Sequence, residues 1–528
     1  MQIDKAQLEQ LQNSGKFEKA LQIVTDFEKN KDLTSQDRLT CQLLKTNLLI
    51  KIGDFESALQ IAEDTLELSK KLEAPLLEID VLIAQAEVLW RLGLLDKGLS
   101  TIATGEQLLE SLTGISPTEE SWRKAALTYH AGTIHFYKGD LDHALDHYKQ
   151  SLQIFEEVGK EQDIAENLGS IGAIYYRKGK LDLALDFLEQ SWLIFEITGN
   201  KQEIAKTLAN IGVIQVTKGE LDRGLEYYQR SLLINEKIEN RQATAAVIRN
   251  IGRTYHQKGD FDQALKYLDH SLELFENIGN NLDTSRTLLY LISVTTDRQT
   301  EPDIQARRYL RRLQEINKHE DNKVINQQYR VAKAMLLKTG ARAISLAKAE
   351  ETLEQVIQEK VIDHEVTIFA MLHLCDLYLY ELKTTGNEEI LNDVRKLIEQ
   401  LKIIAKQQHS YSLLAEIFLL QSKLLLLELQ VKEALQLMTR AQLLTEEKGL
   451  IRLQQIITSE YSSIIVQLDK WEKFRDHKLP LKELVELTNL DVLLDRLIYK
   501  RLYQKEEELL DYAKKAHEMV KTLEDDNE

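Results

Sequence analysis

Apolar residues recur at helical spacing in pairs of segments, and a short polar turn separates the two segments of each pair. In one pair, Ile171 and Ile174 precede the turn at Gly179, and Leu181 and Leu185 follow it. Spacings of three and four residues place such side chains on one face of an α-helix. Each pair therefore predicts a helical hairpin, in which two α-helices run antiparallel around a turn.

Four copies of this hairpin follow one another at an offset of 40 residues, with a lysine-glycine pair at 138/139, 178/179, 218/219 and 258/259. A self-similar period of this length indicates a solenoid, in which each unit buries its apolar face against its neighbours. The glycines mark turns, and a phosphate-binding loop is not expected because no strand precedes them. Small residues recur where two helices must approach closely: Gly132, Gly172, Gly212 and Gly252, then Ala144, Ala184, Gly224 and Ala264, then Ser151, Ser191, Ser231 and Ser271.

The same rhythm extends in both directions along the chain. Turn glycines at 15, 53 and 93 predict three earlier hairpins, and candidate turns at 296–302, Gly340, Gly386 and near Gln430 predict four divergent later ones. We therefore predict an all-α solenoid of about eleven helical hairpins. By regularity it divides into N-terminal hairpins (1–122), four regular units (123–282), divergent hairpins (283–470) and C-terminal capping helices with an acidic tail (471–528).

A terminal cap is expected because the last repeat of a solenoid otherwise exposes its apolar face, and a separate docking module is the alternative for this segment.

Composition supports the helical prediction, since 528 residues include only four prolines and 22 glycines. A net charge of -18 opposes general binding to nucleic acid or to anionic membranes. Two cysteines cannot form a disulfide framework, and the chain has no apolar run long enough for a membrane span and no signal sequence at its start. These features predict a cytoplasmic protein without membrane insertion.

The regular units resemble the tetratricopeptide repeat (TPR) family. The family has a small residue and an aromatic residue in the first helix, which are Gly172 and Tyr175 here. It also has a turn glycine and an alanine in the second helix, which are Gly179 and Ala184, and residues 252–264 repeat the pattern. The 40-residue unit is longer than the usual repeat of about 34 residues, and it is similar to the arrays of kinesin light chain, G-protein-signalling modulators and LuxR-type activators. The resemblance covers residues 125–282 and implies a right-handed superhelix with a concave binding surface.

In TPR arrays the concave surface is lined by positions 2, 5, 9, 12 and 13 of each first helix, and this spacing lies on one helical face. The resemblance therefore implies a peptide-binding groove that runs from aromatic to basic. Carboxamides at position 6 suit the N–H and C=O groups of an extended peptide; ordinary solvent-facing residues are the alternative. The expected groove residues are Tyr129, Thr133, Phe136, Tyr137, Ala173, Tyr176, Arg177, Asn210, Val213, Arg249, Asn250, Arg253 and His256.

The basic end of this face predicts a protein or peptide partner with acidic and apolar residues. Because we expect Arg249 and Arg253 to be exposed, reversing their charges should leave stability nearly unchanged. The lysine and asparagine pattern of the TPR clamp for chaperone tails is absent here, since Gly169 and Ala173 occupy two of its positions. A heat-shock chaperone tail is therefore not the expected ligand.

Two further clusters suggest other chemistry. His143 and His147 stand four residues apart, beside Asp142 and Asp146, and could form a metal pair on one helix face. Their counterparts in the sister repeats are not ligands, so we expect no metal. The four arginines in QARRYLRRLQ (Arg307, Arg308, Arg311 and Arg312) share a helix face that is either solvated or a contact for carboxylates, phosphates or nucleic acid.

The sequence shows no catalytic triad or nucleophile elbow, so we expect neither an enzyme nor a cofactor. The leading hypothesis is a non-catalytic protein-protein interaction scaffold that binds a peptide or protein segment in its groove. A ligand-sensing regulatory TPR domain of a signalling system is the alternative. An RNA-binding solenoid, which would rest on the arginine cluster, is a further one.

Overall fold

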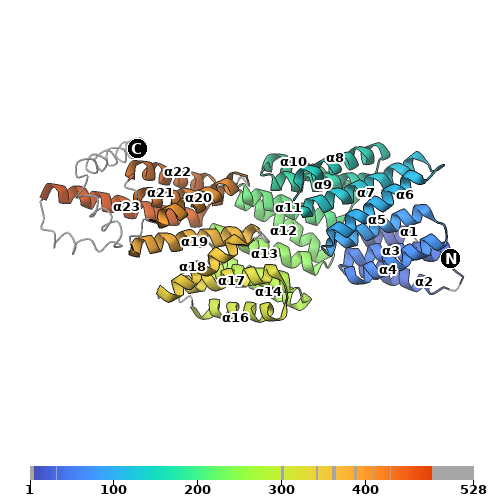
Figure 1. The fold of residues 1–528 in the computed structure, drawn as a ribbon, viewed down its shortest axis with the longest axis horizontal. Helices are drawn as coiled ribbons and strands as arrows, with labels where there is room; N and C mark the ends of the chain where they lie inside the picture. Colours follow the sequence, from blue (N-terminus) through green and yellow to red (C-terminus); the bar gives the residue numbers. More distant parts are fainter. Residues whose placement is uncertain are drawn as a thin grey trace. The chain divides into compact units, whose positions relative to one another are not determined.

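The structure is a computed structural model that describes residues 5–30, 32–298, 303–339, 343–359, 364–385, 389–407, 410–427 and 430–477. Within these ranges every regular element is an α-helix, and there are 23 of them (Figure 1). Their bounds are α1 Lys5–Asn13, α2 Phe17–Glu28, α3 Ser35–Ile52, α4 Phe55–Lys71, α5 Pro75–Arg91, α6 Leu95–Ser111, α7 Pro117–Lys138, α8 Leu141–Val158, α9 Glu161–Arg177, α10 Leu181–Thr198, α11 Lys201–Thr217, α12 Leu221–Lys237, α13 Arg241–Lys258, α14 Phe261–Ile278, α15 Asn281–Asp297, α16 Asp303–His319, α17 Lys323–Thr339, α18 Ala343–Gln358, α19 His364–Thr385, α20 Ile390–Gln407, α21 Tyr411–Leu427, α22 Val431–Glu447 and α23 Ile451–His477.

Consecutive helices form eleven hairpins, from α1/α2 to α21/α22, and α23 follows them. This confirms the all-α prediction and the number of hairpins. The predicted turn glycines end first helices in the left-handed region, where a side chain is disfavoured, with φ of 85° at Gly139 and 71° at Gly179. Gly340 and Gly386 lie outside the described residues, as does the predicted cap after His477. Among the described helices, none combines the length and the apolar character needed to cross a membrane.

The chain divides into two compact units. Unit 1 comprises residues 1–214 and 226–244, and unit 2 comprises residues 215–225 and 245–528. The boundary crosses α11 and α12 and therefore falls inside the regular repeats. The boundaries predicted after residues 122, 282 and 470 separate segments by the regularity of their repeats, whereas the two units are separated by compactness. The predicted boundaries therefore stay a prediction.

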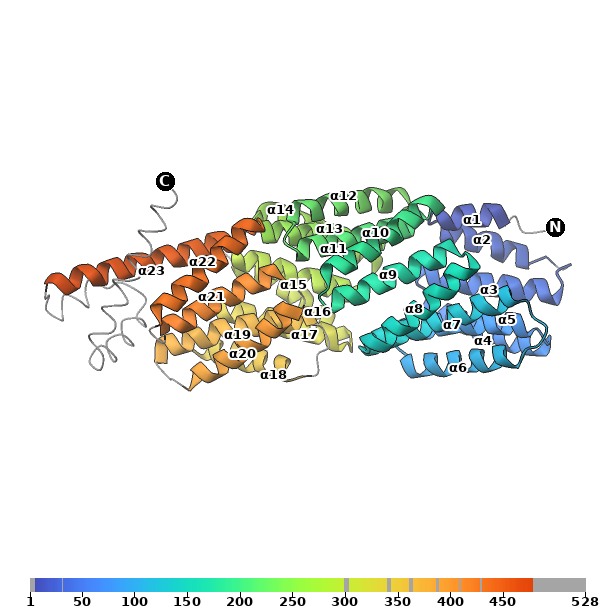
Figure 2. The same ribbon diagram turned by 90° about the horizontal axis from the view of Figure 1, so that it is seen from above.

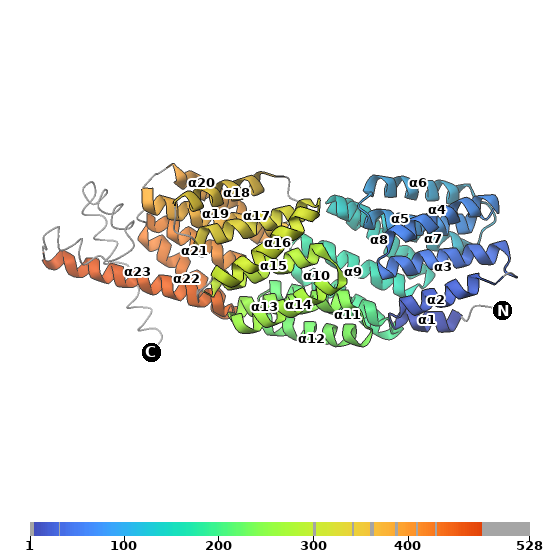
Figure 3. The same cartoon turned by 90° about the horizontal axis from the view of Figure 1, so that it is seen from below.

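Within each unit the first helices of successive hairpins contact one another. In unit 1, α3 contacts α5, α5 contacts α7, and α7 contacts α9 (Figure 2). In unit 2, α15 contacts α17 and α17 contacts α19 (Figure 3). Second helices such as α4, α6, α16 and α18 pack between their own first helix and the next one, as α8 does between α7 and α9. The first helices α3, α5, α7 and α9 therefore form a wall in unit 1, as α15, α17 and α19 do in unit 2. The side chains on these walls are candidates for ligand contact.

The recurring serines tie the two helices of each regular hairpin together. Ser151 is fully buried on α8, and its Oγ donates a hydrogen bond to the carbonyl oxygen of Ala125 on α7 at 2.9 Å. The same bond, with the same separation of 26 residues, joins Ser191 to Ala165 (2.7 Å), Ser231 to Ala205 (2.7 Å) and Ser271 to Ala245 (2.8 Å). A buried hydroxyl needs such a partner, so the serines recur for hydrogen bonding as well as for their small size.

The recurring glycines and alanines lie at the closest approach of the two helices. A Cβ atom on Gly172 would lie 3.0 Å from Leu188 Cγ and 3.1 Å from the carbonyl oxygen of Ala184. Ala184 itself has no exposed surface. The α9/α10 interface therefore has no space for a larger side chain at either position, as the repeat pattern predicted.

We expect Ala184→Leu to lower the free energy of unfolding by roughly 1–3 kcal/mol, because extra methylene groups in a packed interface force side chains and backbone apart. Urea denaturation of the full chain, followed by helical circular dichroism, measures the effect. Leu183→Ala is the control, since the Leu183 side chain is exposed and its loss is expected to change little. An unchanged midpoint for Ala184→Leu would show that the repeat phase is wrong.

Lysines of three lysine-glycine pairs, Lys138, Lys178 and Lys258, reach back to the preceding hairpin. Lys138 Nζ lies 2.7 Å from Asp96, and Lys178 pairs with Asp142 in the same way. Both aspartates are highly exposed, so each pair contributes little to stability. These contacts follow the repeat register, because they join equivalent positions of neighbouring hairpins.

Candidate functional site

A row of aromatic rings and guanidinium groups crosses the first helices of unit 1. The Trp90 ring on α5 stacks on Tyr137 of α7, with centroids 4.9 Å apart, and Tyr137 meets the edge of Phe136 at 5.6 Å. Arg91 Cζ lies 4.5 Å from the Trp90 centroid, and Arg177 Cζ of α9 lies 4.0 Å from the Phe136 centroid. We call these five residues the aromatic row. Its central Tyr137 is 52% exposed, which is high for so large a ring.

Three members of the aromatic row, Phe136, Tyr137 and Arg177, are predicted groove residues. Trp90 and Arg91 are not among the predicted residues, because their hairpin precedes the first regular unit. The signal was present, however: Trp90 and Arg91 precede the turn at Gly93 by the same three and two residues that separate Phe136 and Tyr137 from Gly139. Trp90 and Arg91 therefore occupy positions 12 and 13 of α5 and extend the aromatic row to the preceding hairpin.

A charged cluster lies on the same helices. Arg91 Nη2 is 2.8 Å from Glu87 Oε1. Burial alone would raise the pKa of Glu87, but its interactions with Lys51, His130 and Arg91 outweigh burial and hold this pKa at about 2. The negative charge of Glu87 in turn raises the pKa of Lys51. Glu87 is therefore ionised at neutral pH and binds the cations around it.

The cluster continues onto α9 and α11. Lys206 Nζ lies 2.9 Å from Glu203 Oε2. Burial raises the pKa of Glu166 to about 7, and the negative charge of Glu203 adds to this effect while Lys51 opposes it. The pKa of Glu203 is lowered, since Lys206 and Lys51 together outweigh its burial. The wall of unit 1 therefore holds mixed charges, with one carboxyl group poised to take up a proton near neutral pH.

Several other predicted groove residues of unit 1 are engaged in packing. Thr133 is buried, and its Oγ1 accepts a hydrogen bond from the Tyr148 hydroxyl at 3.0 Å. The Tyr129 hydroxyl lies 3.2 Å from Ser170 Oγ, and burial raises the pKa of Tyr129 well above its usual value. The remaining ones differ in exposure: Ala173, Tyr176 and Val213 are half-buried, and Asn210 is exposed.

In unit 2 the predicted basic residues of α13 are paired with carboxylates. Arg249 is only 8% exposed, and its Nη1 donates a hydrogen bond to Asp283 Oδ1 at 2.6 Å. Arg253 forms an ion pair with Glu365 of α19, which also accepts a 2.6 Å hydrogen bond from the Tyr290 hydroxyl. The expectation that both arginines are exposed is therefore wrong for Arg249, because α15 covers it and supplies its counter-ion.

His256 on α13 is part of a further network. Its Nε2 lies 2.8 Å from Asp297 Oδ2, and Arg452 Nη1 lies 2.9 Å from the same oxygen. Burial alone would raise the pKa of Asp297, but these partners outweigh burial and hold the pKa at about 2. Glu416 is the second partner of Arg452, and burial raises its pKa to about 7. The fourth predicted residue of this helix, Asn250, is half-buried. The side chains of Arg249, Arg253 and His256 are thus paired with carboxylates inside unit 2.

The arginine-rich segment forms α16, as predicted. Tyr309 and Leu313 are buried, and the Tyr309 hydroxyl donates a 2.8 Å hydrogen bond to Asp269. Arg307, Arg308 and Arg311 lie on the exposed face, and Arg312 pairs with Glu276 of α14. The amphipathic pattern therefore placed this helix correctly.

Comparisons with known proteins agree with this architecture. Residues 124–191 and 203–291 match the model of the tetratricopeptide repeat family, so the regular part of the chain is a TPR array. A search of curated proteins gave no match.

Among solved structures, the apo form of RapI is similar over 70% of this chain and 98% of its own, with 19% identity and a TM-score of 0.50. The apo form of the quorum sensor NprR from B. thuringiensis is similar over 69% of this chain and 100% of its own, with 15% identity and a TM-score of 0.51. The TPR-like repeats of a kinesin light chain type from Podospora anserina cover 39% of this chain and 99% of their own, with 13% identity and a TM-score of 0.29. At these identities the similarity to RapI and NprR shows a shared fold of helical repeats.

Proposed function

We propose that this chain is a non-catalytic interaction scaffold and that the first-helix wall of unit 1 binds an extended peptide or protein segment. The aromatic row is the observation that supports this most directly. Tyr, Trp and Arg are the residues that dominate binding energy at protein interfaces. Here a half-exposed tyrosine stands between two other rings and two guanidinium groups, at first-helix positions that line the concave surface in TPR arrays.

The same wall favours a ligand of mixed character. Apolar or aromatic side chains suit the exposed ring of Tyr137, and carboxylates suit guanidinium groups such as that of Arg177, which bind them bidentately. Glu87 on α5 and Glu166 on α9 lie on the same helices, and Glu203 lies on α11; their carboxylates repel a uniformly acidic segment. We therefore propose a partner that combines a few acidic residues with apolar ones, as the sequence predicted, and that binds to unit 1.

A ligand-sensing array is the second candidate. The likeness to NprR, a quorum sensor, favours it, although a likeness at 15% identity concerns the fold. A cytoplasmic location is part of the proposal and is supported by the two cysteines, which are both free.

A peptide library selected on the full chain tests the proposed site. We expect the enriched peptides to carry an aromatic or large apolar residue near an acidic one. Their affinity, measured by fluorescence anisotropy, should fall about 30-fold or more in the double variant Tyr137→Ala plus Arg177→Glu, which is the loss expected for an interface hot spot.

The matched control is Arg307→Glu plus Arg311→Glu, which reverses two exposed charges on α16 and should leave the affinity unchanged. If the control abolishes binding and the Tyr137/Arg177 variant does not, the binding site lies on unit 2. If peptides without acidic residues bind equally well, the proposed ligand chemistry is wrong.

A further inference from the structure

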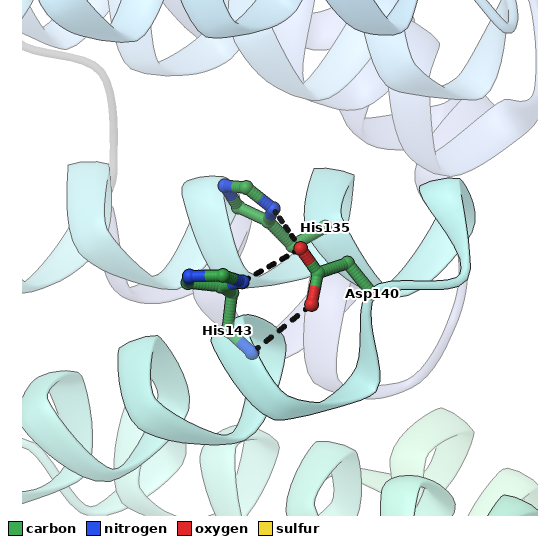
Figure 4. A group of neighbouring side chains, drawn as sticks. All are labelled: His135, Asp140 and His143. Atoms are coloured by element: carbon green, nitrogen blue, oxygen red, sulfur yellow. Dashed lines mark hydrogen bonds and ion pairs between the residues drawn. The ribbon is translucent and has the colours of Figure 1, made fainter.

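Three potential ligand side chains meet at the turn between α7 and α8. His135 lies in the last turn of α7, Asp140 caps the N-terminus of α8, and His143 lies in its first turn. His143 Nδ1 is 2.7 Å from Asp140 Oδ2, and His135 Nδ1 is 3.6 Å from the same oxygen (Figure 4). One ligand atom from each residue lies within 4.8 Å of the others.

These separations suit a shared metal ion. Zinc binds imidazole nitrogen and carboxylate oxygen at about 2.0–2.2 Å, so donor atoms around one ion lie roughly 3–4 Å apart. Small rotations of the two rings can bring the present donors to such distances, because His143 is exposed and His135 is half-buried. Two imidazoles and one carboxylate form a donor set for borderline divalent ions such as Zn²⁺, Co²⁺ and Ni²⁺.

The sister hairpin α13/α14 shows that the turn itself does not need these histidines. There Asp260 caps α14 through a hydrogen bond from Gln263 N at 3.0 Å, just as Asp140 accepts one from His143 N at 3.3 Å. Gln263 occupies the position of His143, and Tyr255 that of His135. Only the α7/α8 turn among the four regular hairpins carries imidazoles at both positions.

Rings that lack ligand nitrogen atoms can also take over the packing role of these histidines. His135 stacks on His147 with centroids 5.3 Å apart, and the equivalent Tyr255 and Tyr267 stack at 5.5 Å. Rings without ligand nitrogen atoms therefore fill these two positions in α13/α14. The His143 ring also lies near His135, with centroids 5.5 Å apart.

We propose that His135, Asp140 and His143 bind one divalent transition-metal ion, for which Zn²⁺ is the probe, with solvent at the remaining coordination positions. The ion would cross-link the facing ends of two helices and so stabilise the hairpin. The spacing of His143 and His147 suggested a metal pair on one helix face. The structure instead joins His143 to His135, eight residues earlier, across the turn.

Calorimetric titration of the metal-free full chain with Zn²⁺, together with its thermal unfolding midpoint, tests the site. We expect one tightly bound ion per chain and a rise of the midpoint with Zn²⁺, because a ligand that binds the folded state stabilises it. His135→Tyr and His143→Gln copy the sister hairpin and therefore keep the fold. Each should weaken binding at least about tenfold, since even outer-shell changes at metal sites cost that much.

His270→Gln is the matched control, because this lone exposed histidine on α14 lies outside the cluster. It should leave both the Zn²⁺ affinity and the midpoint shift unchanged. The proposal is overturned if the wild-type chain binds no stoichiometric Zn²⁺, or if the two cluster variants bind it as tightly as the wild type does.

Discussion

Replacing Arg249 with glutamate is expected to lower the free energy of unfolding of unit 2 by about 3–5 kcal/mol, the usual cost of breaking a buried ion pair. Arg249 is almost wholly buried, donates to Asp283 at 2.6 Å, and lies with its Cζ 5.1 Å from the Phe275 ring centroid. A glutamate would lose both contacts and would add a second negative charge beside Asp283. The carboxylate of Asp283 would keep only weaker compensation, such as Arg286 at 3.8 Å.

Hydrogen exchange on α13 and α15 is the appropriate measurement, because a repeat array opens locally and need not unfold in one step. Lys396→Glu is the control, since Lys396 and Asp393 form an exposed pair on α20 whose loss should cost less than about 1 kcal/mol. Equal protection in the Arg249→Glu variant and the wild type would show that the Arg249–Asp283 pair does not form.

Arg123→Ala should destabilise unit 1 by a similar amount, about 3–5 kcal/mol. The guanidinium group on α7 binds the Asp80 carboxylate on α5 through two bonds, Nε to Oδ1 at 2.7 Å and Nη2 to Oδ2 at 3.0 Å. Both side chains are largely buried. Removal of Arg123 leaves an uncompensated carboxylate between two hairpins, and chemical denaturation monitored on unit 1 measures the loss.

This destabilisation should depend on pH. Burial raises the pKa of Asp80, and the Arg123 guanidinium opposes that rise. Without Arg123 the pKa of Asp80 in the folded state becomes higher still, so the folded chain holds a proton that the unfolded chain releases. The deficit relative to the wild type is therefore largest above this pKa and shrinks as the pH is lowered through it.

The double variant Arg123→Met plus Asp80→Leu provides the control, because it removes both charges and keeps apolar volume. Its stability should recover most of the loss, as replacements of buried ion pairs often do. A deficit of Arg123→Ala that is constant between pH 4 and 8, a range of about four units around the ordinary and raised carboxyl pKa values, would show that Asp80 is not its source.

The hairpins and their turns followed from the sequence alone. Gly139 and Gly179 mark turns because only glycine adopts a positive φ there without strain, and this requirement is local. Ala184 and Ser191 mark the helix interface because the period of 40 residues places the same small residues at each equivalent contact. Local geometry and a repeated register thus determined the number, order and phase of the helices, together with Phe136, Tyr137 and Arg177 in the aromatic row.

The partners of the charged groups were decided only by the tertiary structure. Arg253 meets Glu365, 112 residues away, and Arg452 meets Asp297, 155 residues away. Such contacts depend on how successive hairpins are rotated against one another, and a sequence period does not encode that rotation. Likewise, the sequence placed His143 beside His147 on one helix, whereas the turn brings it to His135 on the other. The sequence therefore specified which residues are charged, and packing across several hairpins determined which charges are neutralised within the fold.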